Sequence, residues 1–396
     1  MNYKAITVCR SCGSGKLVDV LSLGNQKIVD FRNEPVAIPL ELVRCAVCTL
    51  VQLRHTTNPE LLWNDGYGYR SGVNDAMVRH LHDIAKQAEQ YVRDGDSVLD
   101  IACNDGTLLS GYTKDVMRVG IDPSKNVAKY AKKILKGLRH KIVYDYFNKE
   151  ALDSIFQVIT CISMFYDLDE PGKFLEDVKV CLKENGVFII QQNYLVSMID
   201  NCAFDNICHE HLEYYSLTSL QMLLNRHGLI TFKVEENELN GGSIRTFICR
   251  IGERPMDRSV EEMMKREVEI DIFGFASKVD DVKRSIKKIV TDLKSRGMTI
   301  YAYGASTRGG TLLQTCGLDH TQIPYVVERN PDKYGKKMEC VGIPIISEKE
   351  ARDLMPDYMM ILPWFFADNF IEREKKYLDA GGHFIIPLPI PIIIQA

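Results

Sequence analysis

Several features common in other protein classes are missing from this 396-residue sequence. No apolar run reaches the about 20 residues that a membrane-spanning helix needs, and three prolines interrupt the isoleucine-rich segment 385–394. The net charge is −4 and no basic run stands out, so we expect neither a membrane nor a nucleic acid as a partner. The first residues lack the apolar core of an export signal, which predicts a cytoplasmic protein.

Two catalytic signatures are absent as well. The chain has no G-x-G-x-x-G loop, the usual fingerprint of a dinucleotide site, and no H-E-x-x-H spacing, which marks zinc hydrolases. The composition is otherwise ordinary for a globular protein, with 45% hydrophobic and 26% charged residues. The length predicts two or three domains.

Four of the twelve cysteines form a pattern. Cys9 and Cys12 make one C-x2-C pair, and Cys45 and Cys48 make another. Two such pairs are typical of a tetrahedral structural zinc site, which has no open position for chemistry. Four unrelated free thiols are the alternative. We expect the zinc site, in a first domain at 1–65, and small buried thiols at the other eight positions.

Strands and helices alternate through the middle of the chain. Mostly apolar segments at 97–101, 118–121, 155–162 and 187–191 are expected to be buried parallel strands, with amphipathic helices between them. This alternation favours a doubly wound α/β sheet in a second domain, 66–252.

The end of this second domain differs from the rest. Segments 230–235 and 243–250 are joined by a turn at Asn240-Gly241-Gly242, which predicts an antiparallel hairpin. Such a hairpin at the edge of a parallel sheet is the mark of class I methyltransferases, which use S-adenosylmethionine (SAM). A dinucleotide dehydrogenase keeps its strands parallel there.

The remaining residues, 253–396, predict a helical linker and a C-terminal Rossmann-like α/β domain. Apolar residues recur at helical spacing between 282 and 293. A strand at 299–303 then leads into the glycine-rich loop 304–310, and the next strand ends in Glu328. The expected fold is therefore α/β: a class I SAM-methyltransferase sheet between a zinc-binding domain and a Rossmann-like domain.

The loop after strand 97–101 is the expected cofactor site, because ligands bind at the carboxyl edge of such sheets. Its small residues let backbone groups approach the methionine part of SAM, and Asp122 is placed to accept hydrogen bonds from the ribose hydroxyls. Ala102 stands where methyltransferases usually have glycine, so a nucleotide fold for NAD is the alternative. The residues expected to bind the cofactor are Asp100, Ala102, Cys103, Asn104, Asp105, Gly106, Asp122, Pro123 and Met164.

The densest polar cluster lies at 205–216, which is expected to face the same sheet edge. It contains His209, Glu210 and His211, and histidine is the side chain best suited to proton transfer near neutral pH. A zinc ligand set and a purely structural turn are the alternatives.

Six motifs follow one another along the chain. They are the paired cysteines, Tyr67-Gly68-Tyr69-Arg70-Ser71-Gly72, Asn104-Asp105-Gly106, Phe204-Asp205 with Glu210-His211, Gly241-Gly242-Ser243-Ile244-Arg245, and Tyr303-Gly304-Ala305. Together they resemble the sugar C-methyltransferase family, whose structural type is a C-3 methyltransferase of nucleotide-linked keto-deoxysugars. The resemblance covers nearly the whole chain.

The resemblance implies a mechanism. Forming a carbon–carbon bond requires a carbon nucleophile, and a 4-keto group acidifies the neighbouring C–H. The base of the family corresponds to His211, with Glu210 beside it. An imidazole with a pKa of about 6.5 is a weak base for this step, so the enolate oxygen must be stabilised. Tyr67, Tyr69 and Asn193 are the candidates for that role.

The implied substrate is a dTDP- or GDP-linked keto-deoxysugar, bound by a monomer or small homo-oligomer. Loop 304–310 either holds its phosphates or only shapes the cleft. The residues expected to bind this substrate are Arg70, Tyr166, His209, Gly242, Arg245, Ser306, Thr307 and Arg308. The competing functions are an O-methyltransferase acting on a nucleotide sugar, an NAD(P)-dependent sugar-nucleotide oxidoreductase and an inactive scaffold.

Overall fold

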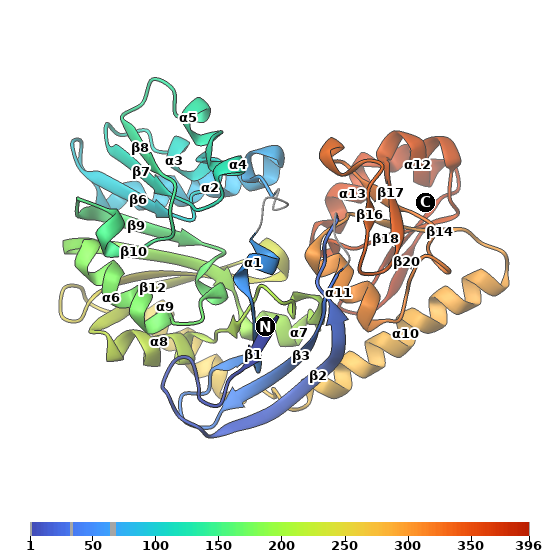
Figure 1. The fold of residues 1–396 in the computed structure, drawn as a ribbon, viewed down its shortest axis with the longest axis horizontal. Coiled ribbons are helices and arrows are strands. Elements are labelled where there is room, and N and C mark those ends of the chain that lie inside the picture. The colour runs from blue at the N-terminus through green and yellow to red at the C-terminus, as the bar shows by residue number, and fades with distance from the viewer. Residues whose placement is uncertain (1, 32–34, 64–68, 396) are drawn as a thin grey trace.

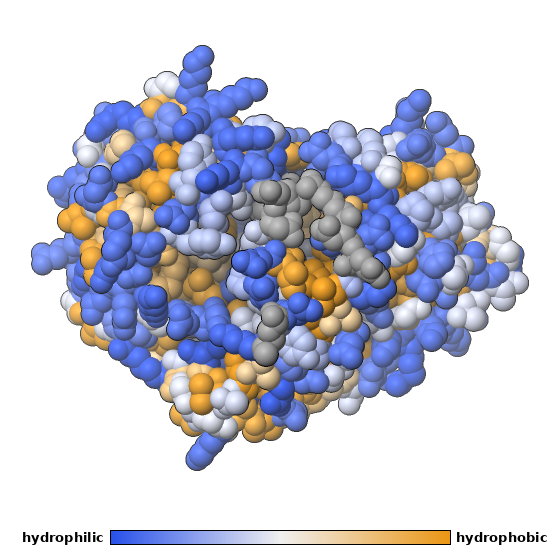
Figure 2. Space-filling model, in the orientation of Figure 1, coloured by the Kyte–Doolittle hydropathy of each residue, from blue (hydrophilic) through white to orange (hydrophobic). Residues whose placement is uncertain are grey.

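The computed structural model describes residues 2–31, 35–63 and 69–395 and divides them among three units (Figure 1). Two α/β units lie side by side, and the N-terminal strands lie below and between them in this view. Hydrophilic residues cover most of the face in Figure 2, and hydrophobic residues gather near its centre. Within the described residues, no helix combines the length and apolarity needed to cross a bilayer.

The N-terminal unit is a small antiparallel β structure. Its elements are β1 (Tyr3–Ala5), β2 (Leu17–Lys27), β3 (Ala37–Cys45), β4 (Val51–Leu53), β5 (His55–Thr57) and α1 (Pro59–Leu62). Strands β2, β3 and β4 form a sheet, and β1 pairs with β5. The fourth strand of that sheet is β11 (Glu213–Tyr214), which comes from the middle of the chain. The N-terminal unit is therefore joined to the middle unit through a shared sheet.

The middle unit is built on a seven-stranded sheet. Its strands are β6 (Ser97–Ile101), β7 (Met117–Ile121), β8 (His140–Val143), β9 (Phe156–Ile162), β10 (Leu182–Asn193), β12 (Leu229–Asn237) and β13 (Ser243–Arg250). Its helices are α2 (Asp75–Ala88), α3 (Thr107–Ser110), α4 (Lys125–Ala128), α5 (Ala131–Ile134), α6 (Pro171–Cys181), α7 (Leu195–Asp200) and α8 (Leu217–Arg226).

The strand order confirms the class I methyltransferase sheet. The order is β12-β13-β10-β9-β6-β7-β8, and β6 to β10 run parallel. Strand β13 is antiparallel to both β10 and β12, so the predicted hairpin supplies the last two strands. Most residues of β6 and β9 are buried, as their apolar sequences require. The carboxyl ends of these strands meet at one edge, where the functional residues gather.

The C-terminal unit is a second α/β sheet with the predicted Rossmann-like parallel strands. It is preceded by α9 (Arg258–Arg266) and α10 (Phe275–Ser295), and consists of β14 (Ile300–Tyr303), α11 (Thr307–Thr315), β15 (Val326–Glu328), β16 (Lys337–Met338), β17 (Ile343–Ser347), α12 (Glu348–Leu354), β18 (Tyr358–Ile361), α13 (Ala367–Arg373), α14 (Lys375–Asp379), β19 (His383–Ile386) and β20 (Ile392–Ile394). Strands β17, β15, β14, β18 and β19 are parallel, and β16 and β20 are antiparallel edge strands.

The segment after residue 252 packs on the middle unit before the chain crosses over. Glu267 accepts hydrogen bonds from the Tyr194 hydroxyl (2.9 Å) and from the backbone N–H groups of Leu217 and Thr218 at the start of α8. The carboxylate thus satisfies donors that a helix N-terminus leaves open. By packing, α9 belongs with the methyltransferase sheet, and α10 is the link to the C-terminal unit (Figure 1).

Several residues of the candidate site lie in short 3₁₀ helices of the middle and C-terminal units. These are η4 (Phe165–Asp167), η5 (Phe204–Asn206), η6 (Leu239–Gly241) and η9 (Trp364–Phe366).

Candidate functional site

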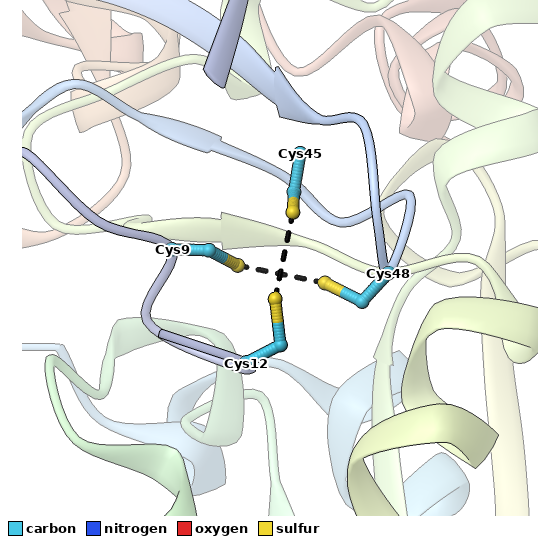
Figure 3. A group of neighbouring side chains, drawn as sticks. All are labelled: Cys9, Cys12, Cys45 and Cys48. Atoms are coloured by element: carbon cyan, nitrogen blue, oxygen red, sulfur yellow. Dashed lines mark hydrogen bonds between the residues drawn. The ribbon is translucent and has the colours of Figure 1, made fainter. Parts of the chain in front are cut away.

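Four sulfur atoms converge in the N-terminal unit (Figure 3). The Sγ atoms of Cys9, Cys12, Cys45 and Cys48 lie within 4.8 Å of one another, and the pairs Cys9–Cys48 and Cys12–Cys45 are each 3.5 Å apart. A tetrahedral zinc ion with Zn–S bonds of about 2.3 Å needs sulfur atoms roughly 3.8 Å apart, so the cluster fits that metal. Gln52 donates a hydrogen bond to Cys9 Sγ (3.2 Å), which favours the thiolate that zinc requires. The predicted ligand set is confirmed.

The zinc-binding loop is fastened to its neighbours by one buried arginine. The Arg10 guanidinium donates to the Leu53 carbonyl (2.6 Å), to Thr56 Oγ1 (2.7 Å) and to Asp169 Oδ1 (3.1 Å) in the middle unit. Leu53 in turn donates its N–H to the Leu212 carbonyl (2.8 Å), next to the pairing of β4 with β11. The zinc-binding unit therefore supports the backbone at the start of β11.

The loop after β6 has the tight backbone expected of a cofactor site. Ala102, Asn104 and Gly106 all have positive φ angles, of 57°, 51° and 80°. Asp122, at the end of β7, accepts the backbone N–H of Asn104 (2.9 Å) on one oxygen and that of Ser124 (2.8 Å) on the other. The Ser124 side chain is a further hydrogen-bond partner of this carboxylate. The predicted hydrogen bonds from ribose hydroxyls to Asp122 stay a prediction.

The other residues predicted to bind the cofactor are buried under this loop or lie at the same edge of the sheet. Asp100 is buried, and burial raises its pKa to about 7. Cys103 packs over Gly120 so closely that a Cβ at Gly120 would lie 2.6 Å from the sulfur. Pro123 follows β7, and Met164 precedes η4 after β9, so both lie at the carboxyl edge of the sheet.

A segment from the start of the middle unit packs against the cofactor loop. Ser71 donates its N–H to Asn104 Oδ1 (3.1 Å), and Asn104 Nδ2 donates to the Tyr69 carbonyl (3.1 Å). Gly72 donates its N–H to Asp105 Oδ2 (2.9 Å), and a Cβ at Gly72 would lie only 2.9 Å from that oxygen. Tyr69 is 51% exposed as a residue, but burial raises the pKa of its phenol and the Ser71 side chain is a hydrogen-bond partner of that hydroxyl.

Two predicted ligands fasten this segment in place. Asp105 is fully buried and accepts a hydrogen bond from Thr107 Oγ1 (2.6 Å). The guanidinium of Arg70 lies 3.8 Å from the Tyr130 ring centroid, and its Nε is 3.8 Å from Asp105 Oδ2. Asp105 and Arg70 thus hold this segment in place, and their predicted contacts with the cofactor and the substrate stay predictions. Tyr67 lies outside the described residues.

His211 has one ring nitrogen fixed by a hydrogen bond, and the part of the chain that the structure describes shows none to the other ring nitrogen. Its Nδ1 is 2.9 Å from the Asn206 carbonyl oxygen, and because a carbonyl can only accept, the ring proton resides on Nδ1. The Tyr166 ring meets the imidazole edge to face, with centroids 4.5 Å apart. Burial, together with the charge of Arg308, lowers the pKa of His211 to about 4, so the ring is neutral at pH 7. Asn193 steadies Asn206 through a 2.6 Å hydrogen bond between their side chains.

Three buried acceptor oxygens belong to Glu210, which precedes His211 in the chain, and to Asp167 and Asn193, which are next to Tyr166 in the chain or bonded to Asn206. Among the described residues, Asn193 Oδ1, Glu210 Oε2 and Asp167 Oδ1 have no hydrogen-bond donor. Burial raises the pKa of Glu210, opposed by hydrogen bonds from Cys208 and Thr307, and burial beside Glu210 holds the pKa of Asp167 well above its usual range. Buried polar atoms normally have partners, so these suit a ligand that carries donors.

Two predicted substrate ligands have packing roles. His209 is buried, and its Nε2 lies 3.2 Å from the Ile38 carbonyl of β3, so it faces the N-terminal sheet. Gly242 has a φ of 114°, and a Cβ there would lie 2.3 Å from the Cβ of Ser197. His209 joins two units, and Gly242 allows β13 to pass close to α7. Their predicted contacts with the substrate stay predictions.

Arg245 and Ser306 are also committed to structural partners. Arg245 is buried and donates to Gln191 Oε1 (3.0 Å) and to Asp83 Oδ2 (3.0 Å), which joins β13 to β10 and α2. Ser306 Oγ accepts the N–H of Gly309 (3.0 Å) and so caps α11. These contacts hold the sheet and the helix, and the predicted substrate contacts of Arg245 and Ser306 stay predictions.

Arg308 is bound by groups of the middle unit, and its predicted contact with substrate phosphates stays a prediction. Its guanidinium is held by the Asp205 carboxylate and the Asn240 carbonyl, both in the middle unit, and Trp364 binds the same carboxylate. Of loop 304–310, only Thr307 keeps a place beside Glu210. The sequence pattern did not reveal Trp364, because a tryptophan in an apolar segment carries no signal of a partner 159 residues away.

Three family models match successive parts of the chain. The model "Putative zinc binding domain" matches residues 9–63, "Methyltransferase domain" matches 69–233, and "C-methyltransferase C-terminal domain" matches 238–389. C-methyltransferase NovU of Streptomyces niveus is 30% identical over 415 residues, which cover 99% of this chain and 98% of that protein. This chain belongs to the C-methyltransferase family.

Other relatives of this C-methyltransferase match only part of it. A tRNA U34 carboxymethyltransferase of Campylobacter jejuni is 27% identical over 36% of this chain and 54% of that protein. Among solved structures, a SAM-dependent methyltransferase from Clostridium acetobutylicum is 16% identical over 44% of this chain and 92% of that one, with a TM-score of 0.36. One from Aquifex aeolicus is 20% identical over 45% and 94%, with a TM-score of 0.35.

Membership of the family settles the cofactor and the enzyme class. The C-methyltransferase takes its methyl group from SAM, and its N-terminal zinc-binding domain carries the four-cysteine cluster. The oxidoreductase and the inactive scaffold considered from the sequence are therefore wrong. The candidate site combines the cofactor loop after β6, the loop that carries His211, and α11 of the C-terminal unit beside Glu210.

Proposed function

We propose that this C-methyltransferase methylates a carbon adjacent to the ketone of a nucleoside-diphosphate 4-keto-deoxysugar, with His211 as the base. The observation that carries the proposal is the state of the imidazole. Its Nδ1–H is held by the Asn206 carbonyl, and the described residues show no hydrogen bond to the Nε2 lone pair. A base that removes a C–H proton needs that arrangement.

The reaction balances as a proton transfer followed by methyl transfer. His211 Nε2 takes the proton from the carbon beside the ketone, and the C–H electron pair forms the enolate. The enolate carbon attacks the methyl group, the new C–C bond forms and the S–CH₃ pair leaves with sulfur. SAM supplies an electrophilic methyl group on a sulfonium, so the protein need not activate the donor.

The low pKa of His211, about 4, makes it a weak base, so enolate stabilisation must supply much of the rate. Tyr69 and Tyr67 are the proposed hydroxyl donors to the enolate oxygen. Asn193 Nδ2 has one hydrogen on Asn206 and a second that is available for the same role. The unpaired oxygens of Glu210 and Asp167 support an acceptor that presents hydroxyl or amine donors.

The substrate class rests on the resemblance of six ordered motifs to sugar C-methyltransferases and on the polar surroundings of His211. We test it with dTDP- and GDP-linked 4-keto sugars and methyl-labelled SAM, followed by mass spectrometry and NMR of the product. The proposal expects the label on a carbon next to C-4. A label on oxygen would establish the O-methyltransferase alternative, and transfer to none of the sugars would refute the substrate class.

The role of His211 is tested by His211→Asn. Loss of a general base lowers kcat by about 100- to 10,000-fold, while SAM binding measured by calorimetry stays unchanged. The matched control is His140→Asn, because His140 begins β8 at the opposite edge of the sheet. Unchanged turnover of His211→Asn would refute the assignment of the base.

The localisation and the oligomeric state of the enzyme are proposals as well. We infer that the enzyme works in the cytoplasm as a monomer or small homo-oligomer. Light scattering on the purified chain measures its mass in solution, and a large assembly would contradict the expectation.

A further inference from the structure

The loop that carries His211 is held by the C-terminal unit through one buried carboxylate. Asp205, in η5, is 0% exposed, and both of its oxygens are occupied from outside the middle unit. Arg308 Nε is 2.8 Å from Oδ2, Arg308 Nη2 is 3.0 Å from Oδ1, and Trp364 Nε1 is 3.1 Å from Oδ2. A two-pronged charged hydrogen bond of this kind fixes orientation as well as distance.

The same arginine holds a second segment of the middle unit. Arg308 Nη1 donates to the Asn240 carbonyl (2.6 Å) in η6, and its guanidinium lies 4.5 Å from the Phe365 ring centroid. The next residue, Gly241, packs so tightly on Trp364 that a Cβ there would lie 2.8 Å from the indole. Arg308 therefore ties two loops of the methyltransferase sheet, η5 and η6, to α11 and η9.

The residue that Arg308 holds is the chain neighbour of the residue that holds the base. Asn206 follows Asp205, and its carbonyl accepts the Nδ1–H of His211 (2.9 Å). The loop between Asp205 and His211 is short and has an internal hydrogen bond, which the Ile207 N–H donates to the Phe204 carbonyl (3.0 Å). A displacement of Asp205 thus moves the carbonyl that sets the tautomer and tilt of the imidazole.

We propose that Arg308, through its buried pair with Asp205, is a positioning residue for His211, so that docking of the C-terminal unit sets the orientation of the base. This inference rests on the proposed function, because it gives His211 that role. The charge of Arg308 further favours the neutral imidazole, in agreement with the lowered pKa of His211.

The variant Arg308→Ala tests the proposal. We expect kcat to fall by about 100-fold, the effect of misplacing a reacting group by roughly 1 Å, while KM for SAM changes by less than a factor of two. Free guanidinium ion in the assay should restore part of kcat by occupying the space left beside Asp205. Arg352→Ala is the matched control, because Arg352 pairs with the buried Glu374 inside the C-terminal unit.

A second readout does not depend on methyl transfer. In nitrogen-15 NMR of histidine-labelled enzyme, the wild type should show His211 as a single Nδ1–H tautomer. Arg308→Ala should show a mixture of tautomers that guanidinium ion reverses, and Arg352→Ala should match the wild type. Because this signal exists without turnover, it distinguishes failure of the clamp from failure of His211 as the base.

The outcomes separate clearly. A lowered kcat with a mixed tautomer and guanidinium rescue supports the proposal. An unchanged kcat, or a loss of kcat with an unchanged tautomer and no rescue, overturns it. If Arg308→Ala does not fold, Trp364→Phe removes one donor to Asp205 and keeps an aromatic ring against Gly241. It should lower kcat by roughly ten-fold with the same change in the NMR signal, and absence of both effects overturns the proposal.

Discussion

A single methyl group added at Gly120 tests the packing beneath the cofactor loop. Gly120 lies within β7, and a Cβ there would be 2.6 Å from Cys103 Sγ and 3.0 Å from Ile142 Cδ1. Ordinary contacts between such atoms are about 3.5–4.0 Å, so the overlap with the sulfur is roughly 1 Å. Gly120→Ala therefore forces one of these groups to move.

The expected cost follows from what can move. Overpacking a core by one methyl group costs about 1–3 kcal/mol. Ile142 belongs to β8 and is held by its pairing with β7, whereas Cys103 lies in the loop that we assign to the cofactor. If the loop takes up all the strain, the Kd for SAM rises by about 5- to 150-fold.

Isothermal calorimetry of SAM binding measures this change. Cys103→Ala in the same chain removes the overlapping sulfur, so the double variant should recover most of the lost affinity. Gly15→Ala is the matched control, because its Cβ would meet only the Thr7 carbonyl at 3.7 Å. Unchanged SAM affinity in Gly120→Ala, or no recovery in the double variant, would refute the assignment of this loop.

Two further predictions concern pH and zinc. The neutral form of His211 is lost only as pH falls through its pKa of about 4, so its contribution to kcat/KM should change little between pH 7 and 5.5. A group with a pKa of about 6.5 would lose roughly nine-tenths of its neutral form over the same range. A pH–rate profile with an inflection near 6.5 would contradict the burial of the base. Removal of zinc, by a chelator or by Cys48→Ser, should lower the melting temperature and abolish turnover together, since the zinc unit supports β11 beside the base. Metal analysis with thermal melting checks this, and full activity in zinc-free protein would contradict it.

The sequence predicted those elements that depend on the spacing of neighbouring residues. The apolar strands β6 and β9, the hairpin of β12 and β13, and the four cysteines depend on local spacing, and spacing is visible in a sequence. Residues 125–135 form two short helices, α4 and α5, and the Ser124 side chain makes no capping hydrogen bond at the start of α4. Pairing of β11 with β4 joins residues about 160 apart, and no local pattern encodes it.

The polar residues of the site show the same limit. His209 and His211 are two positions apart in one motif, yet the first faces Ile38 of the N-terminal sheet and the second faces Tyr166. Arg308 lies in a glycine-rich loop that suggests phosphate binding, but a buried carboxylate 103 residues away takes its charge. A sequence shows which side chains can carry a charge or a proton, but packing decides which partner each one meets.

Exchange of substrate hydrogen for deuterium tests the central claim most directly. With S-adenosylhomocysteine in place of SAM, a keto-sugar nucleotide in heavy water can lose and regain its C–H but cannot be methylated. The wild-type enzyme should introduce deuterium at the carbon beside the ketone, and His211→Asn should not. Exchange by His211→Asn at the wild-type rate would contradict the account, because another group would then be removing the proton.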